Sequence, residues 1–168
     1  MNRAVIPRGF DIVSIGHGSR TLEEMLRILR ARGITCVVDV RRFPTSRKFP
    51  HFAGSAMRRW LAEARVEYVQ MGDTLGGYRT GGYEAWMQTP RFEAGLEALI
   101  ERALRERQAG GLVAFMCSER LPWRCHRRFI ARALARRGLS VLHVIDERRD
   151  WAPGGEVPGA TPPAPRSG

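Results

Sequence analysis

Residues 112–138, LVAFMCSERLPWRCHRRFIARALARRG, constrain the fold of this chain more than any other segment. The apolar run at 112–116 predicts a buried strand, and the residues from Cys125 onward predict an amphipathic helix. The apolar stripe of that helix consists of Phe129, Ile130, Ala133 and Leu134. The loop between strand and helix carries two thiols, a carboxylate, an imidazole and several guanidiniums. Open α/β sheets bind ligands at such loops, beyond the carboxyl ends of the strands. The segment therefore predicts an α/β fold with a functional site after this strand.

The rest of the chain repeats the alternation of strand and helix. Further strands are expected at residues 11–15, 34–40, 66–71 and 139–145. Helices are expected to begin at Thr21, near Ala56 and at Thr89. This order predicts a three-layer α/β/α sandwich of the Rossmann or flavodoxin type, with a mostly parallel sheet of about five strands. We expect one domain over residues 1–149 and a disordered tail over the Pro/Gly-rich residues 150–168.

The composition fits a globular protein of a reducing compartment. The chain has 168 residues, of which 43% are hydrophobic, as in an ordinary single domain. It contains no apolar run near the roughly 18 residues of a membrane span, and its start lacks the apolar core of a signal peptide. Three cysteines, an odd number, argue against a disulfide framework. We therefore expect a cytoplasmic protein without a membrane partner.

The net charge of +11 favours anionic partners. These could be nucleic acids, nucleotides or phosphorylated metabolites, so we expect either an anionic small molecule or nucleic acid. Lys48 is the only lysine, so nearly all of the basic charge is arginine. A skewed genome composition alone could also produce that excess.

Polar segments follow three of the predicted strands, after Ile15, Val40 and Met116. In a parallel sheet, segments that follow strands lie along one edge. Side chains far apart in the sequence are thus expected to converge on one crevice: His17, Arg41, Arg47, Cys117, Glu119 and His126.

Four segments in a fixed order carry a resemblance to a known protein family. They are Ile15-Gly16-His17-Gly18-Ser19, Val38-Asp39-Val40-Arg41 with Pro44 and Ser46-Arg47, Leu75-Gly76-Gly77, and Met116-Cys117-Ser118-Glu119 followed by Cys125-His126-Arg127. Together they resemble the family called domain of unknown function 488. This chain departs from the family pattern at Gly18, which separates the histidine from the serine. The resemblance implies an α/β domain with a shared pocket and no particular reaction.

Cys117 and Cys125 are candidate nucleophiles. A thiol reacts as its thiolate, which nearby positive charge or a helix N-terminus stabilises, and Cys125 opens the predicted helix among arginines. The Cys-x5-Arg spacing of cysteine phosphatases is not met, because six residues separate Cys117 from Arg124. Cys117 could instead be a small hydrophobe at the end of a buried strand. A redox pair would require Cβ atoms about 4 Å apart, which the spacing does not predict.

No metal and no cofactor are predicted. Cys117 and Cys125 lie eight residues apart, whereas paired structural zinc thiols are usually separated by two to four residues.

The other candidate residues divide into proton-transfer and binding groups. Glu119 and His126 could move a proton, so the predicted catalytic set is Cys117, Glu119, Cys125 and His126. The predicted substrate-binding set is His17, Ser19, Asp39, Arg41, Ser46, Arg47, Gly76, Gly77 and Arg127. One guanidinium can donate two parallel hydrogen bonds to two oxygens of a phosphate, so these arginines could bind the substrate. Alternatively, they could form a solvated face. Glu119 could instead orient an arginine, and Asp39 could hold a turn by bonding loop amides.

These observations predict an enzyme that acts on a phosphate-bearing substrate, which could be derived from nucleic acid. The alternative is a non-catalytic nucleic-acid-binding module that uses the arginine face of the last helix, Arg128, Arg132 and Arg136. A thiol or metal sensor is a third, weaker interpretation.

Overall fold

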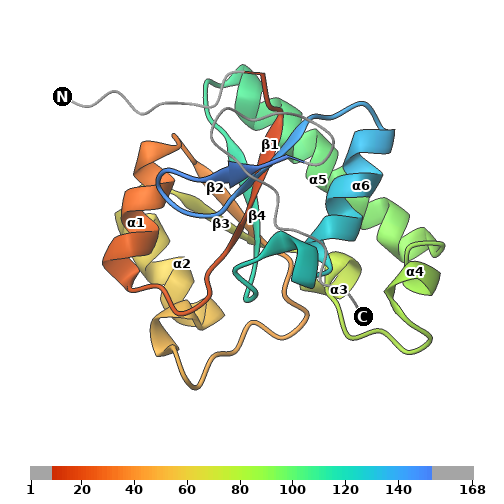
Figure 1. Ribbon diagram of the computed structural model, residues 1–168, viewed down its shortest axis with the longest axis horizontal. Helices are drawn as coiled ribbons and strands as arrows, with labels where there is room; N and C mark the ends of the chain where they lie inside the picture. Colours follow the sequence, from red (N-terminus) through yellow and green to blue (C-terminus); the bar gives the residue numbers. More distant parts are fainter. Residues whose placement is uncertain (1–8, 153–168) are drawn as a thin grey trace.

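A six-stranded sheet forms the centre of the protein in this computed structural model, which describes residues 9–152 (Figure 1). The strands are β1 (Ile12–Gly16), β2 (Cys36–Asp39), β3 (Glu67–Gln70), β4 (Val113–Cys117), β5 (Val141–Val144) and β6 (Asp150–Trp151). Their order is β3-β2-β4-β1-β5-β6, and every pair is parallel except β5 with β6. The predicted α/β sandwich with a mostly parallel sheet is confirmed. The sheet takes in β6, two residues of the segment expected to be a tail, and residues 153–168 lie outside the described part.

Helices cover both faces of the sheet. Helices α1 (Leu22–Ala31) and α2 (Gly54–Glu63) pack on one face, and α5 (Pro90–Gln108) and α6 (Arg127–Arg136) pack on the other. The remaining turns are η1 (Pro50–Phe52), α3 (Gly72–Leu75), α4 (Tyr83–Trp86) and η2 (Pro122–Arg124). Within residues 9–152, every helix is too short or too polar to cross a membrane.

The central strands β1, β2 and β4 are mostly apolar because both of their faces are covered. Val37 and Ala114 join the cluster with α1 and α2, whereas Val38 and Phe115 join the cluster with α5 and α6. Successive residues of a strand point to opposite faces, so a strand that is covered on both faces is apolar at most positions.

Threonine N-caps begin helices α1 and α5 at the positions that the sequence predicts. The Thr21 hydroxyl accepts a hydrogen bond from the Glu24 amide at 3.1 Å, and Thr89 does the same for the Phe92 amide at 3.3 Å. Helix α6 differs, because it begins at Arg127 and not at Cys125. The η2 turn ends just before Cys125, and the extended backbone of Cys125 delays the start of the helix.

The strand order brings three polar loops together. Strand β4 lies between β1 and β2, and the ends are level, since Cys117 pairs with Gly16 and Met116 pairs with Asp39. The chain leaves β1 and β2 toward one face of the sheet and leaves β4 toward the other. Neighbouring loops that diverge in this way leave a crevice at the carboxyl edge of the sheet.

Candidate active site

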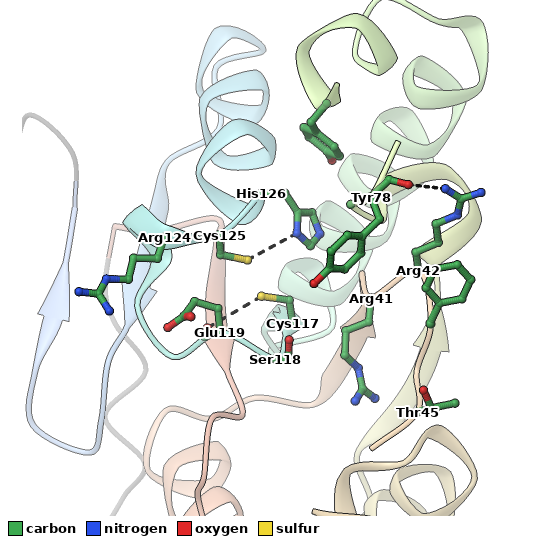
Figure 2. Close-up of a pocket in the computed structure, with 13 residues that line it drawn as sticks. Arg41, Arg42, Thr45, Tyr78, Cys117, Ser118, Glu119, Arg124, Cys125 and His126 are labelled. Atoms are coloured by element: carbon green, nitrogen blue, oxygen red, sulfur yellow. Dashed lines mark hydrogen bonds between the residues drawn. The ribbon is translucent and has the colours of Figure 1, made fainter. Parts of the chain in front are cut away.

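A cavity of about 570 Å³ lies at this carboxyl edge (Figure 2). The residues that line it are Arg41, Arg42, Phe43, Thr45, Gly77, Tyr78, Tyr83, Cys117, Ser118, Glu119, Arg124, Cys125 and His126. A second cavity of about 370 Å³ is lined by His17, Gly18, Ser19, Thr45, Ser46, Phe49, Ser118, Glu119 and Arg120. The two cavities share Thr45, Ser118 and Glu119 and therefore adjoin.

Cys125 and His126 form a thiol–imidazole pair in the larger cavity. The Cys125 Sγ atom lies 3.5 Å from His126 Nδ1, and His126 Nε2 lies 3.0 Å from the Val40 carbonyl oxygen. A carbonyl can only accept, so Nε2 carries the hydrogen and Nδ1 of the neutral ring is free to take the thiol proton. The Arg127 amide, in the first turn of α6, also donates to Cys125 Sγ at 3.5 Å.

Cys125 is the thiol that this environment ionises. A hydrogen bond from the Cys117 thiol, followed by His126 and the charge of Arg127, lowers the pKa of Cys125 well below its usual range, against the opposing effect of burial. Burial raises the pKa of Cys117, which stays protonated, and its Sγ lies 3.9 Å from the Glu119 carbonyl oxygen that accepts from it. The environment therefore favours the ionised form of Cys125 and the protonated form of Cys117.

Arg127 does not face the cavity. It is fully buried, and its guanidinium donates to Cys117 Sγ at 3.1 Å and to Ser14 Oγ at 2.9 Å. It also donates to the carbonyl oxygens of Glu119, at 2.5 Å, and Arg120, at 3.4 Å. Direct anion binding by Arg127, as the sequence suggested, does not fit this placement, because protein acceptors occupy the guanidinium. Arg127 instead anchors the loop that carries Cys117 and Glu119.

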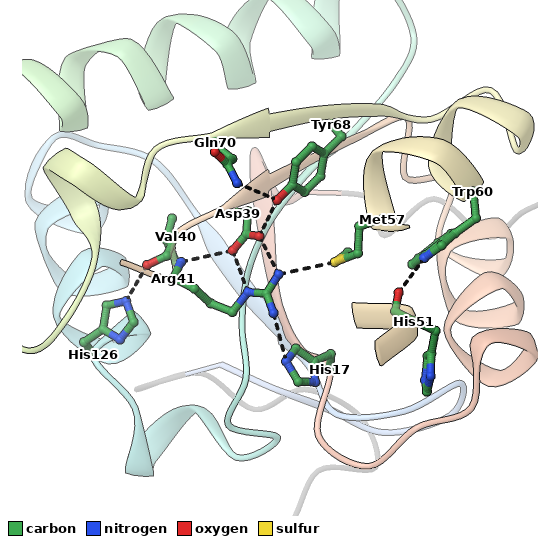
Figure 3. A network of polar contacts seen from close by, with 10 residues as sticks. All are labelled: His17, Asp39, Val40, Arg41, His51, Met57, Trp60, Tyr68, Gln70 and His126. Atoms are coloured by element: carbon green, nitrogen blue, oxygen red, sulfur yellow. Dashed lines mark hydrogen bonds and ion pairs between the residues drawn. The ribbon is translucent and has the colours of Figure 1, made fainter. Parts of the chain in front are cut away.

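Asp39 and Arg41 form a buried ion pair beneath the site (Figure 3). The Asp39 carboxylate accepts from Arg41 Nε at 2.9 Å and Nη2 at 2.7 Å, and from the Tyr68 hydroxyl at 2.6 Å. It also accepts from the Arg41 amide at 3.1 Å, which holds the turn after β2. Asp39 was a predicted substrate-binding residue, but its carboxylate is fully enclosed and orients Arg41 instead.

His17 is a neutral histidine at the edge of the second cavity. Its Nδ1 donates to the Gly18 carbonyl at 2.9 Å, and its Nε2 accepts from Arg41 Nη1 at 3.3 Å. The ring stacks on Phe52 with centroids 4.5 Å apart. Burial lowers the pKa of His17 to about 4. Ser19 and Ser46 line the same cavity.

The other predicted binding residues have different placements. Arg47 is exposed and lines neither of the two cavities. A Cβ atom at Gly76 would lie 2.4 Å from the Gly72 carbonyl oxygen and 2.7 Å from the Arg42 Cα atom, so this glycine allows close backbone packing. Gly77 lines the larger cavity, where a Cβ atom would come within 3.3 Å of His126 Nδ1. Glu119 lines both cavities, and its Oε1 atom accepts from the Leu121 amide at 3.2 Å.

The model of the family described as "Domain of unknown function DUF488" matches residues 21–134, more than half of the chain. The chain belongs to this family. The match confirms the resemblance seen in the sequence and spans α1 to α6, which includes Cys117, Cys125 and His126. No curated protein and no solved structure is similar enough to match this DUF488 chain.

Cys117, Cys125 and His126 are also the residues of this DUF488 site that are suited to a metal ion. One ligand atom from each lies within 4.8 Å of the others. However, the Arg127 guanidinium lies 3.1 Å from Cys117 Sγ, and a fixed positive charge there opposes a second cation. We therefore interpret the cluster as hydrogen-bonded thiol chemistry, and the absence of a metal stays a prediction.

Several lining residues of the DUF488 pocket were not among the predicted site residues. They are Arg42, Phe43, Thr45, Tyr78, Tyr83, Ser118 and Arg124. Arg42 and Phe43 directly follow Arg41, and Ser118 lies between two predicted residues, so the ends of β2 and β4 were usable signals. The short helix that carries Tyr83 gave no such signal, because it follows Gly81 and Gly82 and not the end of a predicted strand.

Two buried histidines are expected to make the fold acid-sensitive. Burial lowers the pKa of His17 from 6.5 to about 4 and that of His143 from 6.5 to about 3. Below pH 6.5 these two histidines become protonated in the unfolded chain but stay neutral in the folded protein, so the free energy of unfolding decreases as the pH falls. Between pH 7 and 5 each histidine should reduce the free energy of unfolding by about 2 kcal/mol.

Urea unfolding at pH 7, 6 and 5 would measure this effect. The variants His17→Gln and His143→Gln should each show a weaker dependence on pH than the wild type, whatever their stability at pH 7. An unchanged dependence in both variants would contradict the assignment of neutral, buried imidazoles.

Proposed function

We propose that this protein is an enzyme that transfers a phosphoryl group from an anionic substrate to Cys125 and then to water. The observation that carries the proposal is the pair of Cys125 and His126 on the wall of a cavity, where Sγ lies 3.5 Å from Nδ1 and the surroundings lower the pKa of the thiol. A thiolate beside an imidazole is the arrangement of an activated nucleophile.

The charges around the cavity support a phosphate-bearing substrate. Among its described lining residues, Glu119 is the single acid, whereas Arg42 and Arg124 are basic; the charge of Arg41, which also lines the cavity, is paired with Asp39. Arg124 is exposed, and Arg120 contributes another guanidinium to the adjoining cavity. A guanidinium can donate two hydrogen bonds to two oxygens of one phosphate, and it remains charged at every relevant pH.

The proposed reaction has two steps. In the first, the Cys125 thiolate attacks phosphorus, an S–P bond forms, the P–O bond to the leaving group breaks, and the imidazolium of His126 gives its proton to the leaving oxygen. In the second, water attacks the phosphocysteine, neutral His126 takes a proton from that water, and the S–P bond breaks. Inorganic phosphate leaves, and the thiolate–imidazolium pair is restored. This chemistry needs reduced thiols, in agreement with the expected cytoplasmic location.

A non-catalytic nucleic-acid-binding module is the second candidate. Arg128, Arg132 and Arg136 are exposed along α6, and Arg128 and Arg132 lie over the Phe129 ring at 4.7 and 5.5 Å. Such a module would bind nucleic acid in a strongly salt-dependent way and would tolerate replacement of Cys125.

Alkylation of the thiols with iodoacetamide separates these candidates. The rate constant for Cys125 should be nearly constant from about pH 5 to 8, because an ionised thiol gains nothing from higher pH. Cys36 should label slowly throughout this range, since burial raises its pKa to about 11. Peptide-level mass spectrometry would follow each cysteine.

A rate for Cys125 that rises about tenfold per pH unit up to about pH 8.5 would show an ordinary thiol and contradict the proposal. The same method, applied after incubation with an aryl phosphate and an acid quench, should find one phosphoryl group on the peptide that contains Cys125.

A further inference from the structure

Two aromatic rings stand exposed on the rim of the larger cavity. Phe43 is 62% exposed and Tyr78 is 88% exposed. Within residues 9–152, Leu104 is the one other exposed large hydrophobic side chain, and it lies on α5 away from this cavity. Exposed rings gathered at a pocket, and not scattered over the surface, indicate a binding surface.

The Tyr78 backbone is held in an unusual conformation. Its φ angle is +56°, which is rare for residues other than glycine. The Tyr78 carbonyl accepts from Arg42 Nη1 at 2.5 Å. Next to it, the Arg79 guanidinium donates to the Gly76 and Gly72 carbonyls at 2.9 Å each. The Arg42 and Arg79 side chains thus hold the backbone at Tyr78 and in the residues before it. Backbone strain that is enforced in this way is typical of functional sites.

Arg42 contacts the Phe43 ring and the Tyr78 backbone. Besides its bond to Tyr78, its guanidinium carbon lies 5.3 Å from the centroid of the Phe43 ring. Figure 2 shows Tyr78 and Arg42 on the opposite side of the cavity from Arg124 and Cys125. We call Phe43, Tyr78 and Arg42 the aromatic rim. It places flat apolar surface and positive charge side by side, across the cavity from the thiolate.

We propose that the aromatic rim stacks on a nucleobase, so that the substrate is a nucleotide, either free or at an end of a single strand. Aromatic rings stack on any unpaired base, and arginines beside them neutralise its phosphates. The net charge of +11 favours such a ligand. The adjoining cavity, with Arg120 and Ser46, has room for the next phosphate of a chain. The position of the reacting phosphate at Cys125 rests on the proposed function, whereas the stacking does not.

Binding to the Cys125→Ser variant would test this inference without turnover. The probes are adenosine 5′-phosphate and ribose 5-phosphate, which differ only in the base, measured by calorimetry. Adenosine 5′-phosphate should bind roughly 5- to 150-fold more tightly, the range expected for one stacked base. Tyr78→Ala and Phe43→Ala should reduce the ratio of the two dissociation constants. Tyr78→Phe, which keeps the ring, and Leu104→Ala, which lies elsewhere, should leave the ratio unchanged. Equal binding of the two probes would overturn the inference.

A single-stranded oligonucleotide with a 5′-phosphate and its duplex identify the source of the nucleotide. Tighter binding of the single strand than of adenosine 5′-phosphate would assign the site to a chain end, and equal binding would assign it to a free nucleotide. Preference for the duplex would contradict stacking, because paired bases cannot reach the rings. Base-dependent binding without any phosphocysteine would leave the inference standing and reject the proposed reaction.

Discussion

The Cys125→Ser variant is expected to hydrolyse an aryl phosphate at least about a thousandfold more slowly than the wild type. A serine hydroxyl stays protonated beside His126, so the nucleophile that starts the reaction is lost. The fold should persist, since the change replaces one atom in a side chain that is 8% exposed. Steady-state release of the phenol would measure the effect, and the unfolding midpoint in urea would confirm that the variant is folded.

The other two cysteines serve as comparisons for this result. Cys36 lies in β2 and outside both cavities, so Cys36→Ala should retain the wild-type rate constant. Cys117→Ala removes the hydrogen bond that most lowers the pKa of Cys125, so it should shift the alkylation profile of Cys125 to higher pH. Full activity in Cys125→Ser would reject the proposed nucleophile outright.

Arg127→Met is expected to destabilise the protein by about 3 to 5 kcal/mol. Arg127 is fully buried, and its loss would leave Ser14 Oγ and two loop carbonyls without their donor. Methionine restores most of the side-chain volume, so the missing hydrogen bonds and charge cause the effect. Urea unfolding at pH 7.5 would measure it.

Arg132→Met is the matched control in the same helix. Arg132 is exposed and lies over the Phe129 ring at 5.5 Å, so its replacement should change the free energy of unfolding by no more than about 0.5 kcal/mol. Similar losses in the two variants would mean that Arg127 is an ordinary helix residue and that the loop after β4 has another anchor.

The sequence predicted the place of the site because strand ends leave clear signals. The buried runs before His17, Arg41 and Cys117 marked three strands, and parallel strands put the residues that follow them at one edge. The sequence did not order the strands, since the insertion of β4 between β1 and β2 depends on contacts between distant segments.

The direction of individual side chains was harder to predict. Arg127 precedes Ile130 and Leu134 by three and seven residues, which places it on the buried stripe of α6, but arginine is rarely buried. Its burial depends on acceptors from β1 and from the loop after β4. Asp39 was the opposite case, because its alternative role as a turn anchor was visible in the sequence and matches the structure.

The central position of β4 also bears on how the protein folds. Strands β1 and β2 are neighbours in sequence, yet each pairs with β4, which begins at Val113. During synthesis the edges of β1 and β2 that face β4 stay unpaired until this late segment emerges. Pairing between segments so far apart in the sequence slows folding and leaves apolar edges exposed. The segment that joins β1 to β2 also brings Cys117, Cys125 and Arg127 into place. A nascent chain therefore holds no activated thiol until β4 has paired with both β1 and β2.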